Sequence, residues 1–212
     1  MLDQAKTAAG LRTRASVLDA AYRLFLRQGF HGTSMRQIAQ EAGISLGAAY
    51  NHFPAKYDIF RCLLAERNPY AALAETLAAI QGDSAATLLG QGMTEAVRIF
   101  SGNPDFIRLV FIDAIEFQGA TVGEVAGGIF PRILAFFQRV VAVGRASGEL
   151  REVSPVIMMR AFAGLMMSGV ALETAMRPLA EFLRVEDWRK GYVDILLHGV
   201  LRPAEEGKVN DK

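Results

Sequence analysis

The chain has 212 residues, of which 51% are hydrophobic and 21% charged, and its formal net charge is +1. A chain of this length and composition can bury a sizeable core and suits one small domain plus one larger one. The single cysteine, Cys62, excludes an intrachain disulfide, and its apolar neighbours favour a buried, inert thiol in a cytoplasmic protein.

The first predicted helix runs from Arg14 to Gln28, and Gly29 is a good residue to end it. Apolar residues recur along it at helical spacing, which predicts one buried face, at Val17, Ala21, Leu24 and Phe25.

Residues 33–53, TSMRQIAQEAGISLGAAYNHF, predict two short helices joined by a tight glycine turn. Thr33 or Ser34 is expected to cap the first helix, and Ser45 the second, because a hydroxyl can accept from the unpaired N–H groups of a first turn. Gly43 suits the turn because glycine readily adopts a left-handed backbone. Within the second helix the inward positions are predicted as Ala48 or Ala49 and Phe53, and the outward set is drawn from Leu46, Gly47, Tyr50, Asn51 and His52. Two helices in this arrangement can seat one of them in the DNA major groove.

The remaining segments are predicted to be helices throughout, with little strand signal. One long helix is expected from Lys56 to about Ile80, linking the two domains. Ser84 is expected to cap a helix that ends near 101–102, and 103–105 (Asn-Pro-Asp) to start one that reaches about Gln118. After a break or restart near 127–131, further helices are expected over 133–145, 155–176 and 185–201.

Charge is distributed unevenly along the chain. Residues 1–62 hold eight basic and four acidic residues, or +4, whereas residues 63–212 hold 15 basic and 18 acidic ones, or −3. A basic amino-terminal part is expected when that part alone binds nucleic acid.

The segment VLDAAYRLFLRQGFHGTSMRQIAQEAGISLGAAYNHFPAKYDIF, within about residues 11–71, resembles the amino-terminal domain of the TetR family of bacterial transcription regulators in its order and spacing. The resemblance implies an all-α protein: a three-helix helix-turn-helix domain over 11–71, then a helical effector-binding and dimerisation domain over 72–204. It implies that Thr33, Tyr50 and Lys56 hold phosphates and that Arg36 approaches the backbone or a base. The full expected DNA-contacting set is Thr33, Ser34, Arg36, Ser45, Leu46, Gly47, Ala48, Tyr50, Asn51, His52 and Lys56.

Two positions depart from the usual family pattern, Leu46 and Ala49, so the base contacts cannot be copied from other members. Leu46 suits a thymine methyl group and Asn51 suits adenine. An alternative reading makes Tyr50 a core aromatic residue and His52 a solvated side chain, in a purely structural helix pair.

The last two predicted helices, 155–176 and 185–201, are candidate dimer interfaces, since the first carries small residues and the second an apolar stripe. The resemblance implies that this pair forms a four-helix bundle with its twofold mate. Internal core of a monomer is the alternative, and a dimer is favoured because twofold symmetry doubles the DNA site.

A small, largely apolar effector is expected among the middle helices, because aromatic and methionine side chains there suit such a ligand. Asp113, Glu116 and Arg160 interrupt apolar surroundings, so they either orient the ligand or form a structural salt bridge. The candidate ligand residues are Phe106, Val110, Asp113, Glu116, Phe117, Phe137, Arg160 and Phe162.

Other functions find little support in the sequence. The three histidines are far apart, no metal-ligand spacing or phosphate-binding glycine loop is present, and no cofactor is expected, so an enzyme is the least favoured reading. A helical small-molecule-binding protein that does not engage an operator is the stronger alternative. No secretory signal is expected, and the apolar segment 161–172 falls short of the roughly 20 residues that cross a bilayer, so no membrane association is predicted.

Overall fold

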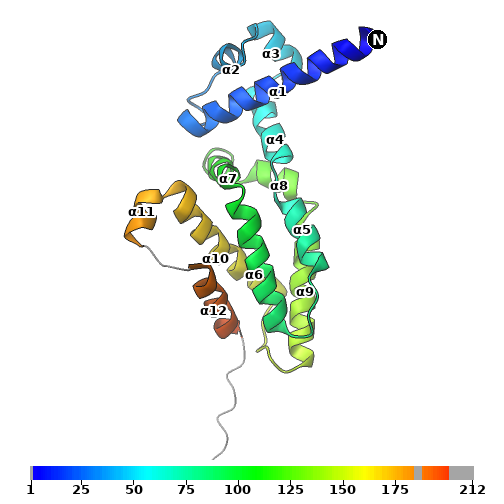
Figure 1. Cartoon of the computed structure of the whole chain (residues 1–212), viewed down its shortest axis with the longest axis vertical. Coiled ribbons are helices and arrows are strands. Elements are labelled where there is room, and N and C mark those ends of the chain that lie inside the picture. The colour runs from blue at the N-terminus through cyan, green and yellow to red at the C-terminus, as the bar shows by residue number, and fades with distance from the viewer. Residues whose placement is uncertain (1, 184–187, 201–212) are drawn as a thin grey trace, which may run out of the picture. The chain divides into compact units, whose positions relative to one another are not determined.

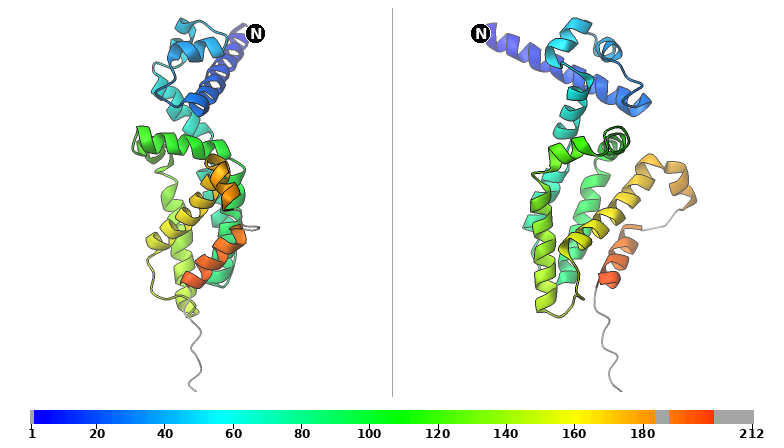
Figure 2. Two further views of the ribbon diagram at one scale, coloured as in Figure 1. Left: turned by 90° about the vertical axis from the view of Figure 1, so that its left-hand side faces the viewer. Right: turned by 180° about the vertical axis from the view of Figure 1, so that it is seen from behind.

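The computed structural model describes residues 2–183 and 188–200, and every regular element among them is an α-helix (Figures 1 and 2). The all-α prediction is therefore confirmed. The helices are α1 (Leu2–Gln28), α2 (Met35–Glu41), α3 (Leu46–His52), α4 (Lys56–Glu66), α5 (Tyr70–Ala79), α6 (Ala85–Ser101), α7 (Pro104–Glu116), α8 (Ala120–Ala126), α9 (Phe130–Ala146), α10 (Pro155–Ala175), α11 (Arg177–Phe182) and α12 (Trp188–Val200).

The chain forms two compact units. The first contains Met1–Pro69 and Asn103–Gly128, and the second contains Tyr70–Gly102 and Ile129–Lys212. The expected boundary near residue 71 lies close to the change at 69–70. The expectation that everything beyond it belongs to one domain differs from this division, because α7 and α8 pack with the amino-terminal helices.

Caps at the predicted residues start several of these helices. The Ser34 hydroxyl accepts from the Gln37 N–H, and the Gln37 side chain accepts from the Ser34 N–H, so the two form a capping box at the start of α2. Ser45 and Ser84 cap α3 and α6 with the hydroxyl alone, which accepts from the N–H of Ala48 and of Thr87 respectively. Gly43 has a φ of +70° in the turn between α2 and α3, a conformation that side chains with a Cβ disfavour.

An aromatic cluster fills the core of the first unit. The Phe30 ring contacts Phe25, Phe60 and Phe117, with centroids 4.8 to 5.5 Å apart, and Tyr57 packs on Phe117 at 5.1 Å. Since Phe117 directly follows α7, this cluster is one reason why α7 belongs to the first unit rather than to the second.

The predicted single helix from Lys56 to Ile80 is wrong. It is broken at 67–69 into α4 and α5, and Pro69 supplies the reason. Proline has no N–H to donate and its ring crowds the preceding turn, so Asn68 and Pro69 separate two helices instead of continuing one.

The second unit is built from α5, α6, α9, α10, α11 and α12. Helix α6 packs against α9, α10 and α12, and a Cβ on Gly92 would come within 2.9 Å of the Phe136 ring. The Arg139 guanidinium donates to the carbonyls of Leu77 and Ile80, which lie at the end of α5. Glycine in α6 and arginine in α9 therefore fix how closely these helices approach.

Helix α10 is longer and more apolar than the segment 161–172 that the sequence analysis considered. By length and composition, Pro155–Glu173 is sufficient to cross a membrane, with a mean hydropathy of 1.6. The same helix packs against α6, α9 and α12 and buries Met158, Phe162 and Met166 along one face. A core helix of a helical bundle has these properties too.

Candidate nucleic-acid interface

The helices α2 and α3 form a compact pair whose inner residues are apolar. Ile38 and Ala39 of α2 are buried, and Ala49 of α3 and the following Phe53 are 0% and 4% exposed. The inward position that the sequence left open between Ala48 and Ala49 is thus Ala49, and Ala48 is half-buried.

The opposite face of α3 is open to solvent. Gly47, Tyr50 and Asn51 are exposed, with Tyr50 at 47%, whereas Leu46 and His52 are half-buried. The alternative reading of Tyr50 as a core aromatic residue is therefore wrong. This face offers a phenol hydroxyl, a carboxamide and a bare backbone at Gly47, which suit contacts with base edges and phosphates.

The predicted contacts at Ser34, Arg36 and Ser45 lie around this face. Arg36 is exposed on α2, so its guanidinium is free to reach a phosphate. The Ser34 and Ser45 hydroxyls are exposed as well, but each already accepts from the backbone of its own helix. Both serines therefore have a structural role that is independent of DNA.

Thr33 is buried and Lys56 is half-buried, and both side chains bond to carbonyls of their own unit. Thr33 is 2% exposed, and its hydroxyl donates to the Gly29 carbonyl at 2.8 Å. The Lys56 ammonium donates to the carbonyls of Phe30 and Thr33 and lies 4.1 Å from the centre of the Phe30 ring. Burial lowers the pKa of Lys56, while the nearby Glu116 carboxylate opposes that shift. The structure therefore gives both residues a positioning role that the family resemblance did not suggest.

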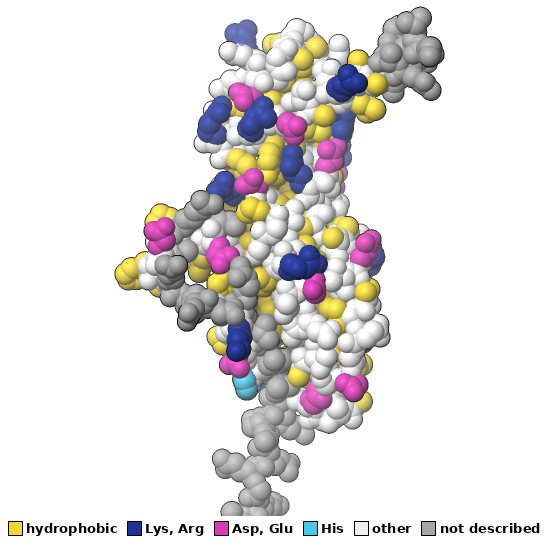
Figure 3. Space-filling view, viewed as in Figure 1, with side chains coloured by type: hydrophobic (Ala, Val, Ile, Leu, Met, Phe, Trp, Pro, Cys, Tyr) yellow, Lys and Arg dark blue, Asp and Glu magenta, His cyan; other side chains and the backbone are white. Residues whose placement is uncertain are grey.

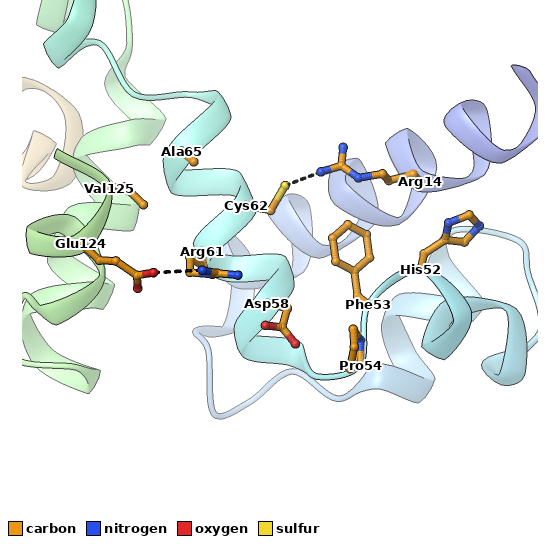
Figure 4. Close-up of a pocket in the computed structure, with 10 residues that line it drawn as sticks. All are labelled: Arg14, His52, Phe53, Pro54, Asp58, Arg61, Cys62, Ala65, Glu124 and Val125. Carbon is orange, nitrogen blue, oxygen red and sulfur yellow. Dashed lines mark hydrogen bonds and ion pairs between the residues drawn. The ribbon is translucent and has the colours of Figure 1, made fainter. Parts of the chain in front are cut away.

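A hollow of about 580 Å³ opens beside the carboxyl end of α3 (Figure 4). His52 and Phe53 line it together with Arg14 of α1, Cys62 of α4 and Glu124 of α8. Arg14 donates to the Cys62 sulfur at 2.7 Å and to the Glu66 carboxylate at 2.8 Å.

Arg14, Cys62 and Glu66 form hydrogen bonds with one another beside this hollow, and these contacts shift the pKa values of the thiol and of the carboxyl. Burial raises the pKa of the Cys62 thiol, and its hydrogen bond to Glu66 raises it further against the opposing effect of Arg14, which favours the protonated thiol. Burial opposes ionisation of Glu66, but hydrogen bonds from Arg14 and Cys62 outweigh it and lower the pKa of that carboxyl. Arg14 was not among the predicted site residues, because its only signal in the sequence is its position one turn before the first buried residues of α1.

The predicted ligand residues of the first unit have protein partners. The Asp113 carboxylate is fully buried and accepts from the N–H groups of Thr121 and Val122, so it caps α8. Glu116 pairs with His31 at 2.7 Å, and Phe117 belongs to the aromatic cluster. Of the remaining two, Phe106 is buried and Val110 half-buried.

The other predicted ligand residues belong to the second unit. Phe137 and Phe162 are buried with ring centroids 5.2 Å apart, and Arg160 is exposed on α10. The partners observed for Asp113 and Glu116 are thus the α8 backbone and His31, and not the salt bridge with Arg160 that the sequence analysis considered.

Comparison with known proteins identifies the region that contains α2 and α3. Residues 17–63 match the family model of bacterial regulatory proteins of the tetR family. The chain is 30% identical over 145 residues to the HTH-type transcriptional repressor BepR of Brucella suis, covering 65% of this chain and 68% of that protein. It is 41% identical over 63 residues to the uncharacterised HTH-type regulator TtgW of Pseudomonas putida, where the match spans 47% of that protein.

Solved structures extend the likeness to the whole fold. The structure of NalD, described as the secondary repressor of the MexAB-OprM multidrug efflux pump in Pseudomonas aeruginosa, covers 92% of this chain with a TM-score of 0.67 and 23% identity. Relatives that match in sequence are transcriptional regulators rather than enzymes, and the helix-turn-helix of α2 and α3 lies within the matched residues. The chain therefore belongs to the TetR family of bacterial regulatory proteins and is a DNA-binding transcriptional regulator.

Proposed function

We propose that this regulator is a homodimeric repressor that binds a palindromic operator through α3 of each protomer and is released by a small, largely apolar effector. The observation that carries the DNA-binding part is the exposed face of α3, with Gly47, Tyr50 and Asn51 outward while Ala49 and Phe53 anchor the helix. Such a regulator acts in the cytoplasm, where the DNA is.

Dimerisation is supported by apolar side chains that the second unit leaves exposed. On α10, Val156 and Ile157 are 44% and 58% exposed, and Ile195 of α12 is 59% exposed. Gly164 of α10 is exposed as well, and a Cβ there would meet nothing within 4 Å, so a second helix can approach closely. Hydrophobic side chains around α11, including Phe182 at 85%, also reach the surface (Figure 3). Several large apolar side chains exposed on one unit favour a protein partner that covers them. A second copy of the chain is the expected partner, because twofold dimers are the commonest protein oligomers.

Effector release is supported by the apolar face of α10 within the second unit. Met158, Phe162 and Met166 line that face, and Phe137 packs on Phe162. Flexible thioethers and flat rings adapt to apolar ligands of varied shape. The effector must prefer the DNA-free state, and tenfold release requires about 1.4 kcal/mol of differential affinity.

The central experiment is a binding titration with the purified full chain. Duplexes enriched from a random pool by selection on the protein serve as the operator, and affinity is measured as salt is raised. A DNA-binding regulator shows specific affinity that falls steeply with salt, since each neutralised phosphate releases counterions. Weak binding that is indifferent to salt and to sequence would leave the helical small-molecule-binding protein as the better description.

Substitutions on α3 are expected to separate phosphate contacts from base contacts. Tyr50→Ala should weaken binding by a similar factor on all operator variants, because a lost phosphate contact carries no sequence information. Asn51→Ala should change which base pair is preferred at one position, with about 1–3 kcal/mol of lost discrimination. Competition among operator variants measures both effects, and equal behaviour of the two proteins would contradict this division.

A charge at the exposed apolar surface of the second unit is expected to split the dimer. Ile195→Glu would place a carboxylate in a buried interface, where its desolvation has no compensating partner. Ile115→Glu is the matched control, because Ile115 is 78% exposed but belongs to the first unit. Light scattering should report a monomer for the first variant and a dimer for the second. A dimer for both would refute this interface.

A further inference from the structure

One face of α4 forms the floor of the hollow beside the carboxyl end of α3 (Figure 4). Asp58, Arg61, Cys62 and Ala65 all line it, and residues spaced by three, four and seven positions share one face of a helix. Arg14 and the end of α3 lie on one side of this face, and α8 lies on the other. The lining residues all belong to the first unit, so the hollow is complete within one folded unit.

The hollow has the volume and the apolar surface of a small-molecule site. Its volume of about 580 Å³ falls within the roughly 300–1,000 Å³ of ligand pockets in proteins. Phe53, Pro54, Ala65 and Val125 contribute apolar surface to its lining. A molecule with an apolar body can therefore bury part of its surface here.

Charges of both signs line the hollow and balance one another. Arg14 and Arg61 carry two positive charges, and Asp58 and Glu124 carry two negative ones. Figure 4 shows Arg14 and His52 on the α3 side of α4 and Glu124 on the opposite side. A ligand with only an anionic group would meet two carboxylates, and one with only a cationic group would meet two guanidinium groups. A zwitterion can instead pair each of its charges with the opposite one.

The charged side chains retain hydrogen-bonding capacity for such a ligand. Arg14 donates one N–H to the Cys62 sulfur at 2.7 Å, and a carboxylate is a much stronger acceptor than a thiol. Asp58 accepts from the Ala55 N–H through Oδ2, and Glu124 accepts from Arg61 through Oε1. Each of these carboxylates has lone pairs left for a further donor. The hollow thus offers donors on the α3 side and acceptors on α4 and α8.

We propose that this hollow is a second ligand site, within the DNA-binding unit itself, for a small zwitterion with an apolar body such as an aromatic α-amino acid. The ligand carboxylate accepts from Arg14 and His52, and the ligand ammonium donates to Asp58 and Glu124. His52 ends α3 and Phe53 is its C-cap residue, so an occupant weakens the contact of α3 with DNA. This last consequence rests on the proposed operator binding, whereas the site itself does not.

The single cysteine of the chain makes occupancy of the hollow measurable, because Cys62 lies in its floor. Mass spectrometry times the alkylation of Cys62 by iodoacetamide in the full chain, with tryptophan, indole-3-propionate or tryptamine present. These probes carry both charges, only the anion and only the cation. Tryptophan at about ten times its dissociation constant should slow alkylation about tenfold, since only the empty hollow reacts. The other two probes should bind at least about tenfold more weakly. No protection by tryptophan, or equal protection by either analogue, would overturn the proposal.

A pair of charge variants tests the assigned contacts. Glu124→Gln removes a carboxylate that binds the ammonium and leaves the thiol untouched, so tryptophan should protect Cys62 about as weakly as indole-3-propionate does. Asp19→Asn is the matched control, because Asp19 is an exposed partner of Arg67 in the same unit and does not line the hollow. It should be protected like the unaltered chain. Equal protection of both variants would contradict the assignment, and matching thermal melts exclude unfolding as the cause.

An operator titration tests the regulatory consequence separately. Tryptophan should weaken operator binding by the unaltered chain and have little effect on the Glu124→Gln variant. Operator affinity that stays unchanged while Cys62 is protected would overturn the regulatory consequence. Protection of Cys62 by operator DNA but not by tryptophan would make the hollow a DNA contact and overturn the ligand site. Failure of the chain to bind any operator specifically would overturn the proposed function, while the alkylation result would still decide the site.

Discussion

Lys56→Met is expected to weaken operator binding strongly, because the partners observed for this side chain belong to the fold itself. The ammonium donates to the carbonyls of Phe30 and Thr33, which lie in the loop between α1 and the Ser34 cap of α2. Methionine preserves the length of the side chain but donates nothing, so these carbonyls lose charged hydrogen bonds that contribute roughly 1.5–3 kcal/mol each. The entry into α2 then loosens, and the presentation of α3 with it.

Thermal unfolding and DNA titration together separate this positioning role from a phosphate contact. Lys56→Met should lower both the melting temperature and the affinity. Arg36→Ala, at an exposed position on α2, should lower affinity alone. If Lys56→Met melted like the unaltered chain and lost only salt-dependent affinity, a direct phosphate contact would be the correct role.

Asp113→Ala is expected to give a second large loss, this time of stability. The carboxylate is fully buried and accepts from the Thr121 and Val122 N–H groups, so its removal leaves two donors at the start of α8 without a partner. Each such donor costs about 1–3 kcal/mol when it is buried. Chemical denaturation measures the change.

The control for this prediction is Glu124→Ala, which removes an exposed partner of Arg61 in the same unit. An exposed ion pair contributes about 0–1 kcal/mol, so this variant should unfold close to the unaltered chain. Should Asp113→Ala unfold normally but fail to respond to an effector, the ligand-orienting role that the sequence suggested would be restored.

Local signals made most of the helix boundaries predictable. Helices begin after Ser34, Ser45 and Ser84 because each hydroxyl accepts a hydrogen bond from the backbone N–H three residues later. Gly43 ends its helix with a positive φ. In each case the causes lie within one turn of the residue, where a single sequence is most informative.

Features that depend on distant partners were not predictable in this way. Asp113 caps a helix that begins seven residues later, and Lys56 donates to the carbonyls of Thr33 and Phe30, which lie 23 and 26 positions earlier in the chain. Polarity alone marked Asp113 as unusual, but only the fold shows that its partner is backbone rather than ligand. The break at Pro69 is a different case, because the proline itself is a local signal for the end of a helix. The apolar residues on both sides nevertheless favoured the prediction of one continuous helix.

The chain passes between its two units three times, at 69–70, 102–103 and 128–129. A hybrid regulator assembled by fusing residues 1–69 to a foreign sensor would therefore leave Phe30, Phe60 and Tyr57 without the Phe117 ring that packs on them. To exchange DNA specificity between relatives without losing this packing, one would graft only the outward residues of α3. The alternative is to transplant residues 103–128 together with residues 1–69.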